Sequence, residues 1–264
     1  MDKNIYLKNL AKKIISLTNK EGRELYRIGK IPRFTNFNTK LVGFLFEAID
    51  SSSFLGQYNE LIKRDIYKFK SSNPYPFIID CGVNIGLSIV CLKKMHLNAK
   101  IIGFEPDPKI FEVAKKNVKT AGFSNVELIK KAVWTEETKL SFYQEGSAGG
   151  RLEKAKNDKT IQVETFDLKK IINQEVDFLK IDIEGAEFDI LKDIEDNLHY
   201  VKNIFIEYHS KINNQQNLGE IINILKRKNF RYYVEDGYSN SINPFISRTE
   251  IDGFDNLLNI YAYK

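Results

Sequence analysis

A short apolar strand pattern that runs directly into a glycine turn and a helix pattern constrains the fold most. Residues 77–86 read Phe-Ile-Ile-Asp-Cys-Gly-Val-Asn-Ile-Gly, and an apolar helix pattern continues from Leu87 to Met95. Gly82 and Gly86 permit backbone conformations that other residues avoid, so the chain can turn tightly here. A helix that begins beyond such a turn directs backbone N–H groups toward a ligand. The segment therefore predicts a strand, a tight turn and a helix N-terminus that faces a nucleotide-like ligand.

From residue 77 onward, strand patterns alternate with helix patterns. The expected strands are residues 77–80, 100–105, 126–130, 176–182 and 202–208, and the expected helices are residues 85–95, 108–121, 185–193 and 216–228. Short strand patterns at residues 139–144 and 160–164 interrupt this order, and residues 230–235 and 257–263 are expected to form a terminal strand pair. Such alternation predicts an α/β fold, with a parallel sheet covered by helices on both faces.

Residues 1–76 do not follow the alternation, and we expect them to form a helical N-terminal extension of a domain that spans residues 77–264. Helix patterns fall at residues 4–19, 41–50 and 57–69, and residues 22–40 read as irregular. One face of the first helix pattern is apolar, with Leu7, Leu10, Ile14 and Leu17. Such a stripe is typical of packing on the domain or on a second subunit, which would make a homodimer.

Composition limits the classes of protein that this chain can form. Its 264 residues are 42% hydrophobic and 28% charged, which is typical of a folded protein with a core. No apolar run approaches the ~18–20 residues that cross a bilayer, and the N-terminus lacks a signal-peptide core. We therefore expect a cytoplasmic protein, in which Cys81 and Cys91 are free buried thiols.

The basic excess of the chain lies entirely in the extension. Residues 1–76 hold 14 Lys and Arg against 7 Asp and Glu, whereas the remaining residues hold 26 against 28. This segment is either a solvated basic surface or a surface that attracts a phosphorylated substrate.

Candidate cofactor-binding residues follow the first three strands, where open α/β sheets bind their ligands. They are Asp80, Gly82, Asn84 and Gly86 after the first strand, Glu105 after the second and Ala132 after the third. A carboxylate at Glu105 suits the ribose hydroxyls of either S-adenosylmethionine (SAM) or NAD. The Gly82-x-x-x-Gly86 spacing differs from the G-x-G-x-x-G pattern of nicotinamide sites, so we expect SAM.

Acidic residues and one histidine follow the fourth and fifth strands. They are Asp182, Glu184, Glu187, Glu207 and His209. Carboxylates this close together repel or take up protons unless a cation pairs with them or they transfer protons. Lys180 lies on the same strand face as Asp182 and is a candidate partner, and Glu187 is expected within the first turn of the next helix. Three of these residues, Asp182, Glu207 and His209, are candidates either for a general base or for the ligands of a divalent metal.

These segments together resemble the FkbM family of SAM-dependent methyltransferases. The matching segments are residues 79–86, 104–108, 163–168, 179–187 and 206–209. The resemblance implies a class I, Rossmann-like methyltransferase fold, with a seven-stranded, mostly parallel sheet and an antiparallel last strand. It also implies O-methylation, with Asp80, Gly82, Asn84 and Gly86 around the methionine part of SAM, Glu105 on the ribose and Ala132 beside the adenine.

We therefore expect a SAM-dependent O-methyltransferase that acts on a sugar hydroxyl, with a nucleotide-linked or glycan sugar from capsule or lipopolysaccharide biosynthesis as substrate. Alternatives are another small natural product, a nucleic-acid methyltransferase, or a non-catalytic module that binds a glycan or partner. Amino-methylating enzymes carry an Asn-Pro-Pro-Tyr box after the fourth strand, where this chain has Asp182-Ile-Glu184-Gly185. Acid would repel phosphates there, so no nucleic-acid partner is expected.

Overall fold

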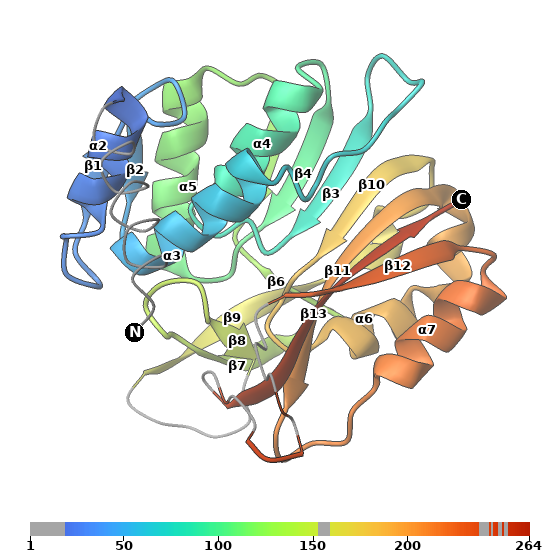
Figure 1. Ribbon diagram of the computed structural model, residues 1–264. Coiled ribbons are helices and arrows are strands. Elements are labelled where there is room, and N and C mark those ends of the chain that lie inside the picture. Colours follow the sequence, from blue (N-terminus) through green and yellow to red (C-terminus); the bar gives the residue numbers. More distant parts are fainter. Residues whose placement is uncertain (1–18, 153–158, 238–242, 244, 248–249, 251–252) are drawn as a thin grey trace.

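The computed structural model describes residues 19–152, 159–237, 243, 245–247, 250 and 253–264. Its centre is a seven-stranded sheet with helices against both faces (Figure 1). In sheet order the strands are β12 (Arg231–Asp236), β13 (Phe254–Tyr263), β11 (Val201–Lys211), β10 (Val176–Ile181), β3 (Phe77–Cys81), β4 (Lys100–Phe104) and β5 (Val126–Ile129). All run parallel except β13, which is antiparallel to both neighbours. The predicted class I methyltransferase fold is confirmed.

Alternate residues of the central strands pack on opposite faces of this sheet. Ile79 and Cys81 of β3 join an apolar core with α6 (Glu187–Asp193) and α7 (Leu218–Arg227). Ile78 joins a second core with α4 (Leu87–Met95) and α5 (Pro108–Ala121). Because helices cover both faces, the strand is apolar throughout until its carboxyl end, where Asp80 stands. Both cysteines are buried and free, as expected.

The order of the sheet brings the candidate segments together at one edge. Cys81, near the end of β3, pairs with Phe104 of β4 on one side and with Ile181 of β10 on the other. The strands are parallel, so the residues that follow them emerge side by side. The glycine turn, Glu105 and Asp182 are therefore neighbours, although they are far apart in the sequence.

The extension differs from the sequence expectation in its local structure. It contains α2 (Lys20–Ile28), β1 (Phe37–Thr39), β2 (Phe46–Ala48), α3 (Ser51–Gln57) and a π-helix, η1 (Tyr58–Lys63). The helix expected at residues 41–50 is wrong, because residues 46–48 form β2, which pairs with β1. The helix begins instead at Ser51, where the Asp50 carboxylate accepts a hydrogen bond from the N–H of Ser53. Residues 22–40, expected to be irregular, hold most of α2 and all of β1.

The helix expected at residues 57–69 is shorter than its pattern, because η1 ends at Lys63. The apolar stripe expected at residues 4–19 lies outside the described residues, apart from Asn19, which caps α2. Apolar side chains of the extension, Ile28, Phe46 and Phe54, are fully buried in the same core as Ile78. The extension therefore packs directly on the α4 face of the sheet.

A second, four-stranded sheet flanks the first and carries a loop to its carboxyl edge. Its order is β6 (Ala132–Trp134), β9 (Thr160–Asp167), β7 (Lys139–Tyr143) and β8 (Arg151–Leu152). The 3-10 helices η2 (Leu168–Lys170) and η3 (Glu195–Tyr200) complete the described elements. The loop between β7 and β8 contains three glycines, Gly146, Gly149 and Gly150.

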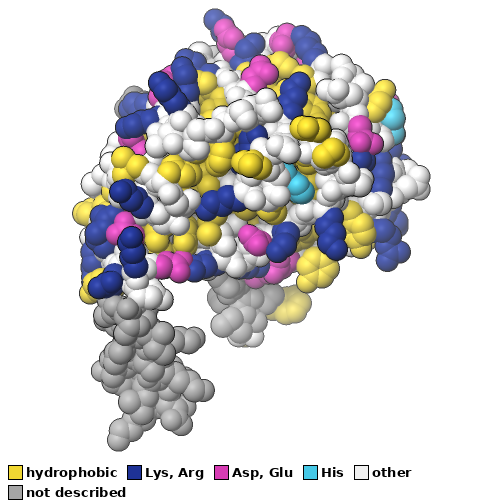
Figure 2. Space-filling view, turned by 90° about the horizontal axis from the view of Figure 1, so that it is seen from above, with side chains coloured by type: hydrophobic (Ala, Val, Ile, Leu, Met, Phe, Trp, Pro, Cys, Tyr) yellow, Lys and Arg dark blue, Asp and Glu magenta, His cyan; other side chains and the backbone are white. Residues whose placement is uncertain are grey.

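The described surface shows two features that bear on partners. No helix in the described ranges is long and apolar enough to cross a membrane. On the face shown in Figure 2, Lys and Arg side chains are dispersed among acidic and apolar ones. Several basic side chains of the extension pair with acids, as Arg27 does with Glu24 and Lys63 with Glu21.

Candidate active site

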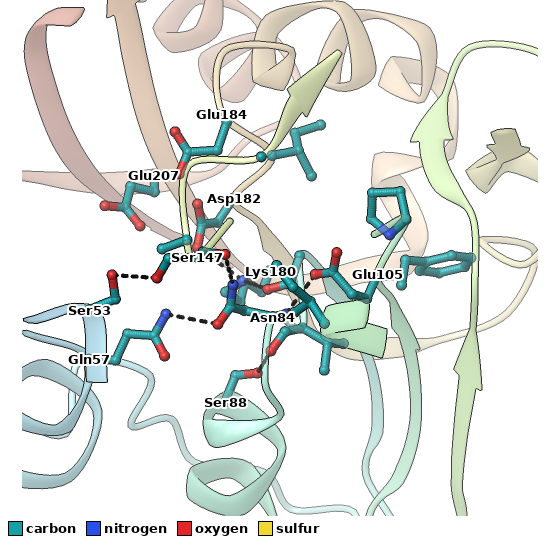
Figure 3. Close-up of a pocket in the computed structure, with 18 of the residues that line it drawn as sticks. Ser53, Gln57, Asn84, Ser88, Glu105, Ser147, Lys180, Asp182, Glu184 and Glu207 are labelled. Carbon is teal, nitrogen blue, oxygen red and sulfur yellow. Dashed lines mark hydrogen bonds and ion pairs between the residues drawn. The ribbon is translucent and has the colours of Figure 1, made fainter. Parts of the chain in front are cut away.

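A cavity of about 380 Å³ lies at the carboxyl edge of the seven-stranded sheet (Figure 3). Its volume lies within the range of small-molecule sites, ~300–1,000 Å³. Its wall combines the glycine turn, the ends of β4 and β10, the middle of β11, the β7–β8 loop and the extension. Six predicted site residues line it: Gly82, Asn84, Glu105, Ala132, Asp182 and Glu207.

The glycine turn after β3 has a conformation that its sequence explains. Gly82 and Gly86 have φ angles of 98° and 90°, in the region that favours glycine. A Cβ atom on Gly82 would lie 2.0 Å from the carbonyl oxygen of Asp182. The backbone N–H groups of Gly82 and Val83 both donate to the carbonyl of Phe104, at 3.1 and 2.9 Å. Backbone of three neighbouring strands thus encloses the turn.

Glu105 fixes the outer part of the same turn. Its carboxylate accepts hydrogen bonds from the backbone N–H of Asn84 and of Asp107, both at 2.9 Å. Burial raises the pKa of Glu105 to about 8, although these two N–H groups favour the ionised form. A carboxylate has about four lone-pair positions, so two remain for hydroxyl groups of a ligand.

Two of the predicted cofactor residues lie behind the cavity wall. Asp80 is fully buried, and its carboxylate lies 3.2 Å from the ammonium nitrogen of Lys180. Gly86 stands at the N-cap of α4, beside the backbone of Ala114. Neither belongs to the described lining residues, so both support the turn from behind.

Carboxylates gather at the other end of the cavity. Figure 3 shows Asp182, Glu184 and Glu207 close together, with Glu105 apart from them. Glu60 of η1 also lines the cavity, and no motif in the sequence identified it as a site residue. Glu60 lies in a helix pattern with no catalytic motif, and the packing of the extension on the sheet brings it to the site.

This acidic end has raised pKa values. Burial raises the pKa of Glu60 to about 7, and Asp182 adds to the effect. Burial also raises the pKa of Glu184 to about 7 and that of Glu207 well above its usual range. Within the described part of the chain, neither Glu60 nor Glu207 has a side-chain hydrogen bond or ion pair, so both carboxyl groups are available to a ligand.

His209 is buried behind these carboxylates. Its Nδ1 lies 3.1 Å from Glu187 Oε1 and 2.9 Å from the backbone oxygen of Glu207, and its Nε2 lies 3.4 Å from Glu184 Oε2. Burial disfavours the imidazolium, but Glu184 and Glu187 outweigh burial and raise the pKa of His209 well above its usual range. Both ring nitrogens therefore face oxygen acceptors. His209 is not among the cavity-lining residues of the described chain.

Glu187 and Lys180 occupy the positions that the sequence indicated. Glu187 is the first residue of α6, and its carboxylate accepts from the N–H of Ile183 and of Gly185, at 3.3 and 2.8 Å. Lys180 lies on the same face as Asp182 and pairs with it at 3.1 Å.

One arrangement at the acidic end suits a metal ion. The ligand atoms of Asp182, Glu207 and His209 lie within 4.8 Å of one another. Two carboxylate oxygens and an imidazole nitrogen are donors that Mn²⁺ or Fe²⁺ accept in proteins. His209 would first have to release the proton that its acidic neighbours hold on it.

A set of hydrogen bonds, here named the clasp, joins the β7–β8 loop to the glycine turn and to the extension beside the cavity. The side-chain N–H₂ of Asn84 donates to the backbone oxygen of Ser147 at 2.9 Å. The Ser147 hydroxyl lies 2.7 Å from that of Ser53 and 3.3 Å from Asp50 Oδ2. Gln57 donates to Asn84 Oδ1 at 3.4 Å. Apart from Asn84, the sequence did not identify these polar partners, because serines and amides in loops carry no distinctive pattern.

The fold and the cavity define a class I methyltransferase. A family model of the methyltransferase FkbM domain matches residues 80–232, more than half of the chain. The chain therefore belongs to the FkbM methyltransferase family, as its motifs predicted.

Individual relatives agree with this assignment. The chain is 26% identical over 183 residues to "Methyltransferase 1" of Beauveria bassiana, covering 56% of this chain and 72% of that protein. It is 27% identical over 190 residues to "Methyltransferase sdnD" of Sordaria araneosa, covering 57% and 73%. Among solved structures, methyltransferase FkbM from Methylobacillus flagellatus KT is similar, with a TM-score of 0.50 and 18% identity over 77% of this chain. That match spans 48% of the other chain, about half its length, and concerns the fold.

Proposed function

We propose that this chain transfers a methyl group from SAM to a hydroxyl group of a small molecule, with a nucleotide-linked or glycan sugar as the substrate class. The observation that carries the proposal is one cavity with the glycine turn and Glu105 at one end and carboxylates at the other. Carboxylates accept hydrogen bonds from hydroxyl groups and can take their protons.

The residues at the first end fit SAM. When bound, SAM supplies the methyl group. Gly82 and Asn84 would border its methionine part, Glu105 would accept the ribose hydroxyls, and Ala132 would border the adenine. Asp80 and Gly86 would act from behind, by holding the turn in shape.

The residues at the second end would orient the acceptor and remove its proton. Of the three candidates for the base, Glu207 fits best, because it lines the cavity and its carboxylate has no partner in the described chain. Asp182 is held by Lys180, and His209 is held between Glu184 and Glu187. A positioned base contributes ~10²–10⁴-fold to the rate, and alignment of the reactants contributes ~7–11 kcal/mol.

The metal version of this mechanism remains a distinct prediction. A divalent ion on Asp182, Glu207 and His209 would lower the pKa of the acceptor hydroxyl. Full turnover after thorough treatment with EDTA would support Glu207 as a metal-independent base. Loss of turnover that Mg²⁺ or Mn²⁺ restores would support the metal.

Two arginines of the extension, Arg33 and Arg27, are paired with carboxylates. Arg33 lines the cavity, and its guanidinium pairs with Asp50 at 2.8 Å, so any phosphate of a substrate would compete with that carboxylate. Arg27 pairs with Glu24. The capsule or lipopolysaccharide pathway, the cytoplasmic location and the homodimer remain predictions.

Calorimetric titration with S-adenosylhomocysteine (SAH) tests the cofactor end. We expect the wild-type chain to bind, and Glu105→Ala to bind more than ~10-fold more weakly, a loss above ~1.4 kcal/mol. Glu127→Ala, on the exposed side of β5, is the matched control and should bind normally. A wild-type chain that binds no SAH would contradict the proposal and favour a non-catalytic binding module.

Nucleotide sugars, assayed with isotopically labelled SAM, test the acceptor end. We expect label in an ether that survives mild base, since O-methyl ethers resist hydrolysis whereas methyl esters do not. Label confined to nitrogen, or found only with nucleic acid, would contradict O-methylation of a sugar.

A further inference from the structure

Lys180 is an unusual residue for the centre of a sheet. It is next to last in β10, and only 1% of its surface is exposed. Lysine is almost never fully buried unless its charge is paired, since an isolated ammonium loses its hydration. A buried lysine beside a ligand cavity therefore has a specific set of partners.

The ammonium group of Lys180 contacts oxygen atoms at the carboxyl ends of two adjacent strands, β3 and β10. It donates to the backbone oxygen of Gly82 at 2.7 Å, and it lies 3.2 Å from Asp80 Oδ1 and 3.1 Å from Asp182 Oδ2. Burial disfavours its charge, but Asp182 and Asp80 outweigh burial and raise the pKa of Lys180. A cation thus joins the turn after β3 to the acidic residue after β10.

The backbone around this cation has little freedom to shift. The N–H of Asp182 donates to the carbonyl of Cys81 at 3.1 Å, and the Asp182 carbonyl occupies the space that a Cβ of Gly82 would need. Gly82 has a φ of 98°, in the region that favours glycine, and in this conformation its carbonyl accepts the hydrogen bond of Lys180. The ammonium of Lys180 on β10 and the carbonyl of Gly82 after β3 therefore hold one another in place across two adjacent strands.

We propose that Lys180 is a positioning residue for the cofactor: by binding the Gly82 carbonyl, it holds the glycine turn in the conformation that receives SAM. This inference rests on the proposed function, because it assigns the turn to SAM. Lys180 reaches the cofactor through Gly82, and it also keeps Asp182 beside the turn, which couples the cofactor end of the cavity to the acceptor end.

The alternative role for Lys180 is purely structural: it would stabilise the fold by neutralising the buried Asp80. Neither carboxylate oxygen of Asp80 has a hydrogen bond of good geometry in the described structure, so Lys180 is its neutralising partner. Removing one partner of a buried ion pair costs ~3–5 kcal/mol, which alone would destabilise Lys180→Met. The single variant therefore cannot separate the two roles.

The separation comes from a double-mutant cycle in full-length protein. Asp80→Asn removes the charge that needs neutralising, and Lys180→Met is then added in that background. The thermal unfolding midpoint and the dissociation constant of SAH are measured for the wild type, both single variants and the double variant. Lys169→Met, which breaks the half-exposed pair with Asp193, is the control for loss of a lysine.

We expect the double variant to regain most of the unfolding midpoint that Lys180→Met loses. We also expect it to bind SAH at least ~10-fold more weakly than Asp80→Asn, because the Gly82 carbonyl has lost its donor. Equal SAH affinity in Asp80→Asn and the double variant would overturn the inference and leave Lys180 a neutralising role only. If the wild type itself binds no SAH, the proposed function fails first, which is a distinguishable result.

Discussion

Among the glycines of the described chain, Gly82 leaves the least room for an added Cβ. A Cβ there would lie 2.0 Å from a backbone carbonyl, so β3 or β10 would have to move. Gly43 has nearly the same φ, 99° against 98°, but nothing within 4 Å of an added Cβ. We expect Gly43→Ala to cost ~1–2 kcal/mol of stability for its backbone conformation alone. Gly82→Ala should cost more and abolish SAH binding; equal losses in the two variants would contradict the steric explanation.

The partnerless carboxyl group of Glu207 predicts a pH dependence of the reaction. A base must be deprotonated, and the pKa of Glu207 is raised well above its usual range, so kcat/KM should rise with pH through that value. We expect Glu207→Gln to lose ~10²–10⁴-fold in kcat and to lose this rise, while SAH affinity stays within about threefold of the wild type. An unchanged pH profile in the variant would assign the base to another group.

For single residues, the sequence predicted which side chains gather near the cavity but not the role of each one. Glu105 and Asp182 follow strands in the order that the pattern predicts, so both line the cavity. His209 was expected after the fifth strand, but it lies inside β11, which ends at Lys211, and Glu184 and Glu187 hold its ring behind the cavity wall. Side-chain direction and pairing depend on packing, which strand spacing alone does not contain.

The clasp shows how single elements complete the site. Ser53 on α3 holds Ser147, whose loop lies over Asn84. A neutral hydrogen bond contributes ~0.5–1.5 kcal/mol, so Ser53→Ala should speed amide exchange at residues 146–150 about 2–10-fold. Exposed Ser124→Ala is the control. Unchanged exchange in Ser53→Ala, measured by mass spectrometry, would show that the loop is held by other contacts.

The elements that carry the chemistry were predictable, whereas those of the extension were not. The strands β3 and β4 are short, mostly apolar runs, and β10 alternates with helices in the order that the sequence predicts. In the extension, residues 41–50 read as one helix, whereas residues 46–48 form β2 and α3 begins only at Ser51. Asp50 separates them by capping α3, a tertiary choice reinforced by its pairing with Arg33.

The molecule as a whole depends on the extension for its core. Ile28, Phe46 and Phe54 are fully buried against the same core as Ile78, and each contributes ~1.5–3 kcal/mol. Together they approach the ~5–15 kcal/mol net stability of a whole domain. We therefore expect a chain truncated to residues 77–264 to lose cooperative thermal unfolding. A truncated chain that unfolds cooperatively at the full-length midpoint would instead support two independent domains with a boundary at residue 77.

The acidic cavity also makes the stability of the whole molecule pH-dependent. The pKa of Glu60 is raised from 4.5 to about 7 in the fold, so the folded state binds more protons than the unfolded state between these values. Stability therefore falls as the pH rises through this window. Glu60→Gln cannot ionise, so we expect its unfolding midpoint at pH 8 to exceed that of the wild type by ~2–4 °C, the shift that ~1 kcal/mol produces. The difference should vanish near pH 4; a difference independent of pH would refute the assignment.

The hydrogen bond between Lys180 and Gly82 can form only after the ribosome has made both residues. The two residues are 98 positions apart in the chain. At ~5–20 residues per second, a ribosome adds that stretch in ~5–20 s. Throughout this interval the nascent glycine turn lacks both its cation and the strand beside it. SAM can therefore stabilise only the completed fold, because its binding site does not exist before Lys180 is in place. The earlier half of the sheet must stay unaggregated during synthesis without help from the cofactor.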